Sequence, residues 1–164
     1  ALRAIFKCSL SNKQSLFLCP TTVLADQHYI SCKNRLSSLG VRVALLSRFK
    51  TKVEQTQIIE SLNNGFVDVV VATHRALSED ISFFDLGLLV IDEKHRFGVA
   101  HKERIRKFKE QIDVLTLTAT PIPRTLQQSL IGVRSVSLIQ THPKSRKPIN
   151  TFVRYFNWSV WTIA

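Results

Sequence analysis

No hydrophobic run in the sequence approaches the roughly 18 residues that a membrane-spanning helix needs. The N-terminus has no signal-peptide pattern, and no internal repeat or low-complexity segment is present. There are only three cysteines, Cys8, Cys19 and Cys32, and no two of them form a C-x-x-C pair. Because an odd number of thiols does not make a disulfide framework, we expect small buried side chains in a reducing cytoplasm and no membrane partner.

Acidic residues are scarce relative to basic ones. The 164 residues include 12 Asp and Glu against 23 Lys and Arg, which gives a formal net charge of +11. A basic surface gains free energy by releasing counterions from phosphates, so the charge favours nucleic acid as a partner. The alternative is a basic surface without a partner. The 45% of hydrophobic residues is enough for a folded domain with a sizeable core.

Glycine is also scarce, and none of the glycines begins the phosphate-binding motif G-x-x-x-x-G-K-S/T. The five are Gly40, Gly65, Gly87, Gly98 and Gly132. The first segment, 1–14, has helical composition but no capping residue before it, which indicates a helix entered in its middle. The chain therefore has no P-loop of its own.

Apolar segments alternate with amphipathic ones along the chain. Strands are predicted at 15–20, 41–47, 67–73, 86–93, 113–120 and 136–140, and helices at 1–14, 21–40, 51–65, 99–112 and 121–132. Several strands are uniformly apolar and rich in β-branched residues, as in a sheet that is buried on both faces. The pattern predicts an α/β fold in which helices cover both faces of a parallel sheet.

The composition changes near the C-terminus. Residues 141–150 contain two prolines and three basic side chains, which is typical of a linker. Trp158 and Trp161 follow it, and two exposed tryptophans would be an unusual end for a complete domain. We expect one domain over 1–140, a linker over 141–150 and the start of another unit over 151–164.

Unusual residues, most of them polar or charged, follow the predicted strands one after another. Because ligands of open α/β sheets bind beyond the carboxyl ends of the strands, these residues predict one continuous functional surface. They are Pro20, Thr21 and Thr22; Ser47, Arg48 and Phe49; Thr73, His74 and Arg75; Asp92, Glu93, Lys94 and His95; and Thr118, Ala119, Thr120 and Pro121.

The adjacent carboxylates Asp92 and Glu93 end an apolar run. A carboxylate at a strand end can hold Mg²⁺ on the phosphates of a nucleotide, and Asp92 suits this role. A second carboxylate can orient or deprotonate the attacking water, and Glu93 suits that one. The alternative is an exposed Asp-Glu turn, which is common in any protein.

Other residues have ordinary structural alternatives. Thr21 or Thr22 can simply cap the helix that follows. Arg48 can be a solvated surface charge, and His28 is expected to pack on its own helix rather than contact a ligand. The basic face of the helix at 99–112 is expected to be solvated rather than a specific DNA site; its members are Lys102, Arg104, Arg106, Lys107 and Lys109.

The complete set of motifs resembles the first motor domain of superfamily 2 DNA translocases. It comprises "PTTVLADQH", "LSRF", "ATHRALSED", "LLVIDEKHRFGVAHKER" and "LTLTATPIPRT", and the resemblance extends over about Ala1–Val153. Within this superfamily the motifs are most similar to the bacterial transcription-repair coupling factors. "HRFGV" and "TATPIPRT" are shared with the RecG helicases, which remodel replication forks.

The resemblance implies a RecA-like fold, ATP and Mg²⁺ as cofactors, and a role for each matching residue. Asp92, Glu93 and His95 match the DExH motif, in which Asp92 serves Mg²⁺ and Glu93 activates water. The motif that couples the nucleotide state to DNA is matched by Thr118, Ala119 and Thr120. Residues expected to contact the DNA backbone are Pro20, Thr21, Thr22, Arg48, Thr73 and His74.

The resemblance also implies missing parts. In the family, a strand and the P-loop precede the helix that 1–14 continues, and a second motor domain follows. We therefore expect a RecA-like domain truncated at its N-terminal strand and P-loop, which does not hydrolyse ATP at a useful rate by itself. The longer protein would be an ATP-driven duplex DNA translocase in the bacterial cytoplasm. It would displace stalled RNA polymerase and recruit excision-repair proteins through regions outside this chain.

Three alternatives are a non-catalytic nucleic-acid-binding module, one lobe of a RecG-like helicase, and a remnant without function. An enzyme lobe in its native context should change its DNA affinity with ATP, whereas a binding module should not. The tail after Val153 departs from the charged pattern expected at the start of a second motor domain.

Overall fold

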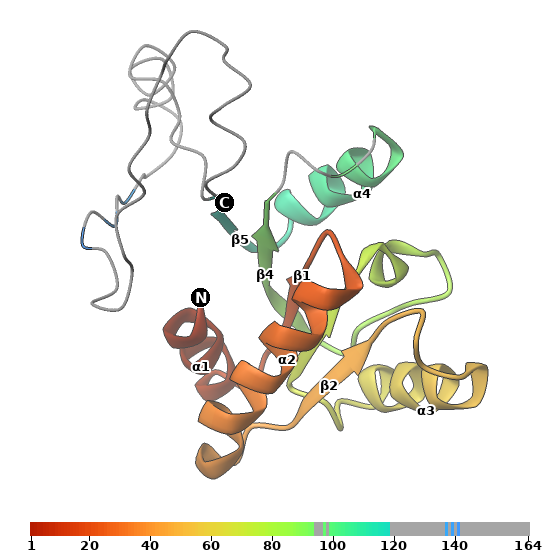
Figure 1. Cartoon of the computed structure of the whole chain (residues 1–164), viewed down its shortest axis with the longest axis horizontal. Helices are drawn as coiled ribbons and strands as arrows, with labels where there is room; N and C mark the ends of the chain where they lie inside the picture. The colour runs from red at the N-terminus through yellow and green to blue at the C-terminus, as the bar shows by residue number, and fades with distance from the viewer. Residues whose placement is uncertain (94–96, 98, 119–136, 138, 140, 142–164) are drawn as a thin grey trace, which may run out of the picture. The chain divides into compact units, whose positions relative to one another are not determined.

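The computed structural model describes residues 1–93, 97, 99–118, 137, 139 and 141. Five parallel strands form one sheet in the order β2-β3-β1-β4-β5 (Figure 1). They are β1 (Gln14–Leu18), β2 (Val43–Leu46), β3 (Val69–Ala72), β4 (Leu86–Asp92) and β5 (Asp113–Leu117). The predicted parallel α/β sheet is confirmed, and each of its first five predicted strands overlaps an observed one.

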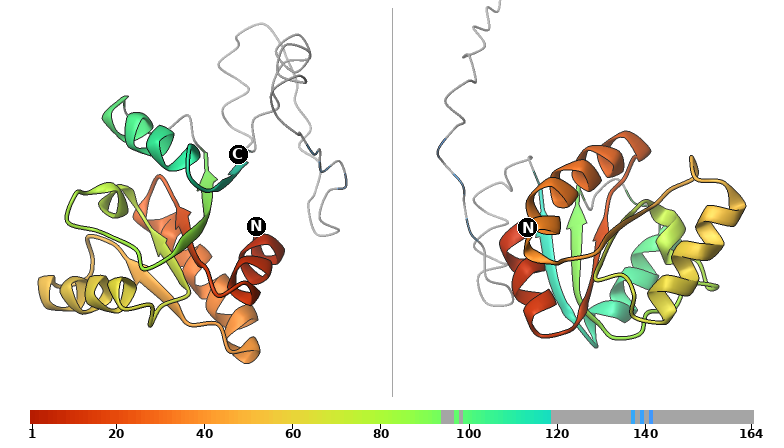
Figure 2. Two further views of the ribbon diagram at one scale, coloured as in Figure 1. Left: turned by 180° about the vertical axis from the view of Figure 1, so that it is seen from behind. Right: turned by 90° about the horizontal axis from the view of Figure 1, so that it is seen from below.

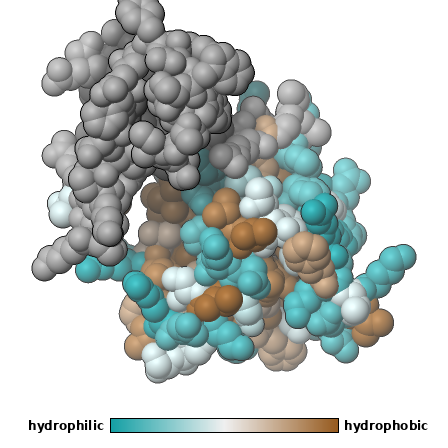
Figure 3. Space-filling view, viewed as in Figure 1, coloured by the Kyte–Doolittle hydropathy of each residue, from teal (hydrophilic) through white to brown (hydrophobic). Residues whose placement is uncertain are grey.

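Helices cover both faces of this sheet (Figure 2). One face carries α1 (Leu2–Leu10) and α2 (Thr22–Leu36), and the other carries α3 (Lys52–Asn63) and α4 (Val99–Lys109). Two short 3-10 helices, η1 (Ser37–Leu39) and η2 (His74–Leu77), complete the described elements. On the face drawn in Figure 3, hydrophilic residues are interspersed with smaller apolar patches over the described surface.

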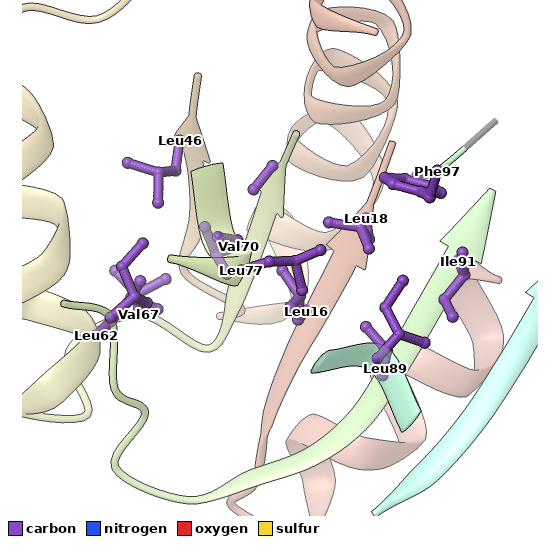
Figure 4. Close-up of a cluster of buried hydrophobic side chains, with 14 residues drawn as sticks. Leu16, Leu18, Leu46, Leu62, Val67, Val70, Leu77, Leu89, Ile91 and Phe97 are labelled. Atoms are coloured by element: carbon purple, nitrogen blue, oxygen red, sulfur yellow. The ribbon is translucent and has the colours of Figure 1, made fainter. Parts of the chain in front are cut away.

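Successive residues of the inner strands face opposite sides of the sheet and fill two cores. Leu16 and Leu18 of β1 point into the core under α3 and α4, where Leu89, Ile91 and Phe97 also lie (Figure 4). The second core, under α1 and α2, contains Ile5, Phe17, Cys19, Ala25, Cys32, Leu36, Val41, Val69, Val71, Leu88 and Val90. This two-sided burial explains why the inner strands are apolar without alternation.

The helix ends follow the predicted capping chemistry. The hydroxyl of Thr21 accepts a hydrogen bond from the Leu24 amide at 3.3 Å, so Thr21 rather than Thr22 is the N-cap of α2. Thr51 and Glu54 form the predicted capping box at the start of α3. Gly40, with φ of 80°, ends η1 in the left-handed conformation that glycine adopts without strain.

The predicted helix over 1–14 was too long. Helix α1 ends at Leu10, Asn12 turns the chain with φ of 55°, and Gln14 is the first residue of β1. The side chain of Gln14 is buried and donates to the carbonyls of Leu62 at 3.0 Å and Val67 at 2.7 Å. These tertiary hydrogen bonds outweigh the helical propensity of the segment, and no local pattern contains them.

Other boundaries differ by a few residues. The strands predicted at 15–20, 67–73 and 113–120 end earlier, at Leu18, Ala72 and Leu117. The 3-10 helix η2, which directly follows β3, was not predicted. Cys19 and Cys32 are buried as expected, but Cys8 is partly exposed, so the prediction of three buried thiols was wrong for Cys8.

Several predictions concern residues that the structure does not describe. The helix at 121–132 and the unit at 151–164 lie outside the described residues, and so do the strand at 136–140 and the linker at 141–150 except for single positions. Within the described part, none of the helices has the length and apolar character required to cross a membrane.

Candidate functional site

The carboxyl ends of all five strands lie at one edge of the sheet because the strands are parallel. Leu18 at the end of β1 pairs with Ala72 of β3 on one side and with Ile91 of β4 on the other. Asp92 pairs with Leu117 at the end of β5. The structure thus brings the predicted site residues among 20–22, 48, 73–74, 92–93 and 118 to the same edge.

The carboxylate of Asp92 is held by a histidine of helix α2. Asp92 is the last residue of β4, its side chain is 17% exposed, and its Oδ2 lies 3.0 Å from Nε2 of His28. The His28 ring also lies against Phe17 of β1, with ring centroids 4.5 Å apart. Packing and one hydrogen bond therefore fix the orientation of the imidazole and of the carboxylate together.

Sequence reasoning missed this role of His28. It was expected to pack on its own helix, but it bridges α2 to the strand that ends in the acidic pair. Its place on the inward stripe of α2 was visible in the sequence. The contact with Asp92 was not, because the two residues are 64 positions apart and meet only in the folded sheet.

Glu93 turns the chain as β4 ends. Its φ is 49°, in the left-handed region that non-glycine residues seldom adopt. Its amide donates to the carbonyl of Leu117 at 3.0 Å, which ties the turn to the end of β5. Uncommon backbone conformations of this kind are found where surrounding contacts over-determine them, often at functional sites.

The remaining members of the two nucleotide motifs are described only in part. Thr118 follows β5 directly and is exposed. His95, Ala119 and Thr120 lie outside the described residues, so the predictions for them stay predictions.

The residues expected to contact DNA differ in accessibility. Arg48 and His74 are exposed, whereas Thr73 is only 3% exposed, so its hydroxyl is not presented to solvent. The hydroxyl of Thr21 caps α2. The residue is nevertheless exposed to solvent at this edge of the sheet. The guanidinium carbon of Arg48 lies 5.6 Å from the centroid of the Phe49 ring.

Arg75, the third residue after β3, is engaged in hydrogen bonds within the protein. Its guanidinium donates to both carboxylate oxygens of Asp80, at 2.8 and 2.6 Å, and to Oε1 of Gln55 at 3.1 Å. The hydrogen bonds with Asp80 raise the pKa of Arg75. Gln55 in turn donates to the carbonyl of Lys50 at 2.9 Å, so η2, α3 and the loop after β2 form one connected network.

The basic face of α4 is not uniformly solvated, contrary to the prediction. Arg104 donates to the carbonyl of Ser78 at 2.9 Å and lies 4.0 Å from the carboxylate of Glu79. It therefore packs α4 onto the loop after η2. Arg106 and Lys107 are exposed, as expected for a solvated face.

The chemistry of the donor set at β4 fits Mg²⁺. This ion is usually bound by one or two carboxylates together with phosphate oxygens and water. Asp92 and Glu93 supply two carboxylates at a strand end. In the described ranges, the end of β4 included, no three His, Cys, Asp or Glu side chains gather in a metal-binding group.

The fold agrees with comparisons to known proteins. The model of the DEAD/DEAH box helicase family matches residues 1–129, and the chain belongs to this family. Over 157 residues it is 52% identical to the transcription-repair-coupling factor of Bacillus subtilis, a match that covers 96% of this chain and 13% of the relative. The factor of Staphylococcus aureus is 54% identical over 159 residues, covering 97% and 14% of the two chains.

Solved structures support the same assignment. A structure of RecG bound to a three-way DNA junction superposes with a TM-score of 0.66 and 38% identity, over 84% of this chain and 18% of that one. The Hef helicase domain of Pyrococcus furiosus, at 18% identity and a TM-score of 0.52, shares the fold. The resemblance drawn from the sequence motifs is confirmed. The chain spans about one seventh of the length of the curated relatives that it matches.

Proposed function

We propose that this chain is part of an ATP-dependent duplex DNA translocase that displaces stalled RNA polymerase and couples transcription to nucleotide excision repair. The observation that carries the proposal is its identity of 52% and 54% to two transcription-repair-coupling factors over nearly its whole length. Contacts with RNA polymerase and with excision-repair proteins, through regions outside this chain, belong to the same proposal, as does a bacterial cytoplasmic location.

In this proposal Asp92 and Glu93 serve the nucleotide. Bound ATP with Mg²⁺ supplies the phosphoanhydride bond whose hydrolysis drives movement. Asp92 would hold the metal, and His28 keeps its carboxylate oriented through the contact at Oδ2. A carboxylate oxygen of Glu93 orients the attacking water and accepts its proton. His95, Thr118, Ala119 and Thr120 link hydrolysis to movement.

The exposed and partly exposed residues of the edge serve the DNA in this proposal. Arg48, His74 and the segment Pro20–Thr22 contact the phosphodiester backbone, which carries no sequence information. Thr73 is buried, so it contributes through its main chain rather than its hydroxyl. A translocase needs this kind of contact because it must bind every sequence that it crosses.

Steady-state ATP hydrolysis by the 164-residue chain, with and without duplex DNA, tests the catalytic part of the proposal. We expect no useful turnover, because the chain contains no P-loop. The matched variant is Glu93→Gln, since glutamine keeps the side-chain shape at the left-handed backbone position. Robust turnover that this substitution abolishes would contradict the expectation and show a complete catalytic site within these residues.

The salt dependence of duplex DNA binding tests the nucleic-acid part. Each phosphate contact that is lost should reduce the slope of log Kobs against log salt by about 0.9. We expect Arg48→Ala to reduce the slope by about this amount. Lys7→Ala removes an equal charge from the C-terminal half of α1, away from the carboxyl edge, and should leave the slope unchanged. An affinity that does not depend on salt would contradict phosphate contacts altogether.

The comparisons do not favour the alternative of a non-catalytic binding module. A RecG-like lobe shares the fold and the proposed chemistry, since the RecG structure is 38% identical. The higher identity to the coupling factors, 52% and 54%, supports the translocase that acts on RNA polymerase.

A further inference from the structure

An exposed aromatic side chain lies at the carboxyl edge of the sheet, where Val23 and Val53 are exposed as well. Phe49 follows β2, and 72% of its surface is exposed. Two other exposed aromatic side chains, Phe66 and Phe84, lie before β3 and before β4, at the opposite edge of the sheet. Phe49 thus combines strong exposure with a position on the edge that carries the candidate site.

The charges around Phe49 suit a polyanion. Arg48 lies over the ring, and Lys50 and Lys52 follow in the same loop and in the first turn of α3. Glu54 neutralises Lys50 through a contact of 2.9 Å, and the charge of Asp26 on α2 also acts on Lys50. Arg48 and Lys52 supply the remaining positive charge near the ring. An aromatic face beside cations is the combination that proteins use to stack on bases while binding the phosphates of the same strand.

The loop that carries Phe49 is held in place. The Phe49 amide donates to Oγ of Ser47 at 3.4 Å, and the Lys50 amide donates to the Ser47 carbonyl at 3.1 Å. Ser47 itself is buried, and the Lys50 carbonyl accepts from Gln55 at 2.9 Å. These bonds fix the main chain on both sides of the exposed ring, so the loop loses little conformational freedom when the ring binds a partner.

We propose that Phe49 stacks on an unpaired base of a nucleic-acid strand whose phosphates contact Arg48. The inference rests on the proposed function, since it requires nucleic acid at this edge, and it adds a ligand class to it. Within a continuous duplex the base faces are covered by their neighbours. The ring therefore binds a strand that is single or locally unpaired, and it selects no sequence because every base has a face on which to stack.

Binding of three labelled probes to the 164-residue chain tests this inference by fluorescence anisotropy. The probes are a single strand of thymidines, a single strand of the same length without bases, and a duplex of that length. We expect Phe49→Ala to weaken binding of the thymidine strand about tenfold, the effect of losing one stacked base. Binding of the strand without bases should not change, and the salt slope should stay as in the unsubstituted chain because no charge is removed.

Two further variants make the test specific. Phe84 has the same exposed fraction, 72%, at the other edge of the sheet, so Phe84→Ala should leave binding of all three probes unchanged. Phe49→Trp keeps an aromatic face and should retain binding of the thymidine strand. Because Phe49 is exposed, its replacement leaves both cores intact.

The possible results separate the two proposals. Equal binding of the thymidine strand by the Phe49→Ala variant and the unsubstituted chain would overturn the stacking inference. An equal loss on both single strands would overturn it as well, since the missing bases would not matter. If the unsubstituted chain binds none of the probes at low salt, the nucleic-acid part of the proposed function fails, and the stacking inference fails with it.

Discussion

The imidazole of His28 and the carboxylate of Asp92 lie 3.0 Å apart, Nε2 to Oδ2, and join helix α2 to the end of strand β4. Both side chains are partly buried, at 31% and 17% exposure. If either side chain is removed, water therefore replaces its hydrogen bond to the remaining partner only in part. The pair orients the residue that we propose as the metal ligand, and its strength can be measured directly.

A double-mutant cycle at this pair should give a coupling free energy of about 1 kcal/mol. His28→Ala and Asp92→Ala are each expected to lower the free energy of unfolding, and the double variant should be more stable than the sum of the two losses predicts. Urea unfolding of the four proteins provides the measurement. Gln27→Ala, an exposed neighbour on α2, serves as the control. Strictly additive losses would show that the two side chains do not interact in solution.

Replacement of Gln14 should lower the free energy of unfolding more than replacement of an exposed polar residue. Its amide nitrogen donates to two buried carbonyls, and its Oε1 accepts from the Asp85 amide at 3.2 Å. Replacement by alanine leaves these three main-chain groups without that partner, at a cost of about 2–4 kcal/mol in the free energy of unfolding. Urea unfolding checks this value, with the exposed Gln57→Ala as the control. A loss as small as that of the control would contradict the importance of these hydrogen bonds.

Asp68 should make stability depend on acid. Burial by itself raises the pKa of the Asp68 carboxyl, but the hydrogen bonds and charge of Arg42 outweigh burial and hold it below its usual range. A lowered folded-state pKa stabilises the fold above the unfolded value of about 3.9, and this stabilisation is lost as the pH falls through the folded value.

The matching variant is Asp68→Asn. At neutral pH it should lower the free energy of unfolding by about 1 kcal/mol, a modest value because Arg42 is half exposed and screened by solvent. The difference from the unsubstituted chain should shrink below about pH 4. Unfolding in urea at several pH values measures it, with the exposed Glu60→Gln as a control. A difference that stays constant from neutral pH to pH 3 would rule out this carboxylate as the source.

The three thiols should react in two classes. Burial, with a smaller contribution from the charge of Asp92, raises the pKa of Cys19 to about 12, and burial raises that of Cys32 to about 11. Since the thiolate is the reactive form, both should resist alkylation at pH 8 until the chain unfolds. Cys8 is partly exposed and should be labelled first. Mass spectrometry of iodoacetamide-treated protein measures the order, and Cys8→Ser should remove the fast reaction. Early labelling of Cys19 would contradict the buried core under α1 and α2.

The sheet and its helices could be predicted from the sequence because their signals are local. Apolar β-branched runs marked the strands, and the Thr51–Glu54 pair marked the start of α3. Boundaries that depend on tertiary contacts were predicted less well. Gln14 belongs to β1 because its amide bonds to carbonyls contributed by distant segments, and such bonds leave no trace in composition or periodicity.

The gathering of the candidate residues at one edge could be predicted as well, since parallel strands place their carboxyl ends there. The state of each side chain there could not. Thr73 is buried although its motif suggested contact with DNA, and Arg104 packs against Ser78 although its charge suggested a solvated face. For Arg104 the loop after η2 decides the environment, and the course of that loop is set by the whole fold.

Helix α2 carries, at its beginning, the segment proposed to contact DNA and, two turns later, the histidine that holds Asp92. A displacement of this helix by either ligand therefore changes the surroundings of the other. Thermodynamic linkage makes such an effect reciprocal: the factor by which DNA changes nucleotide affinity equals the factor by which nucleotide changes DNA affinity. One helix shared by the two proposed sites would therefore let the two binding equilibria influence each other.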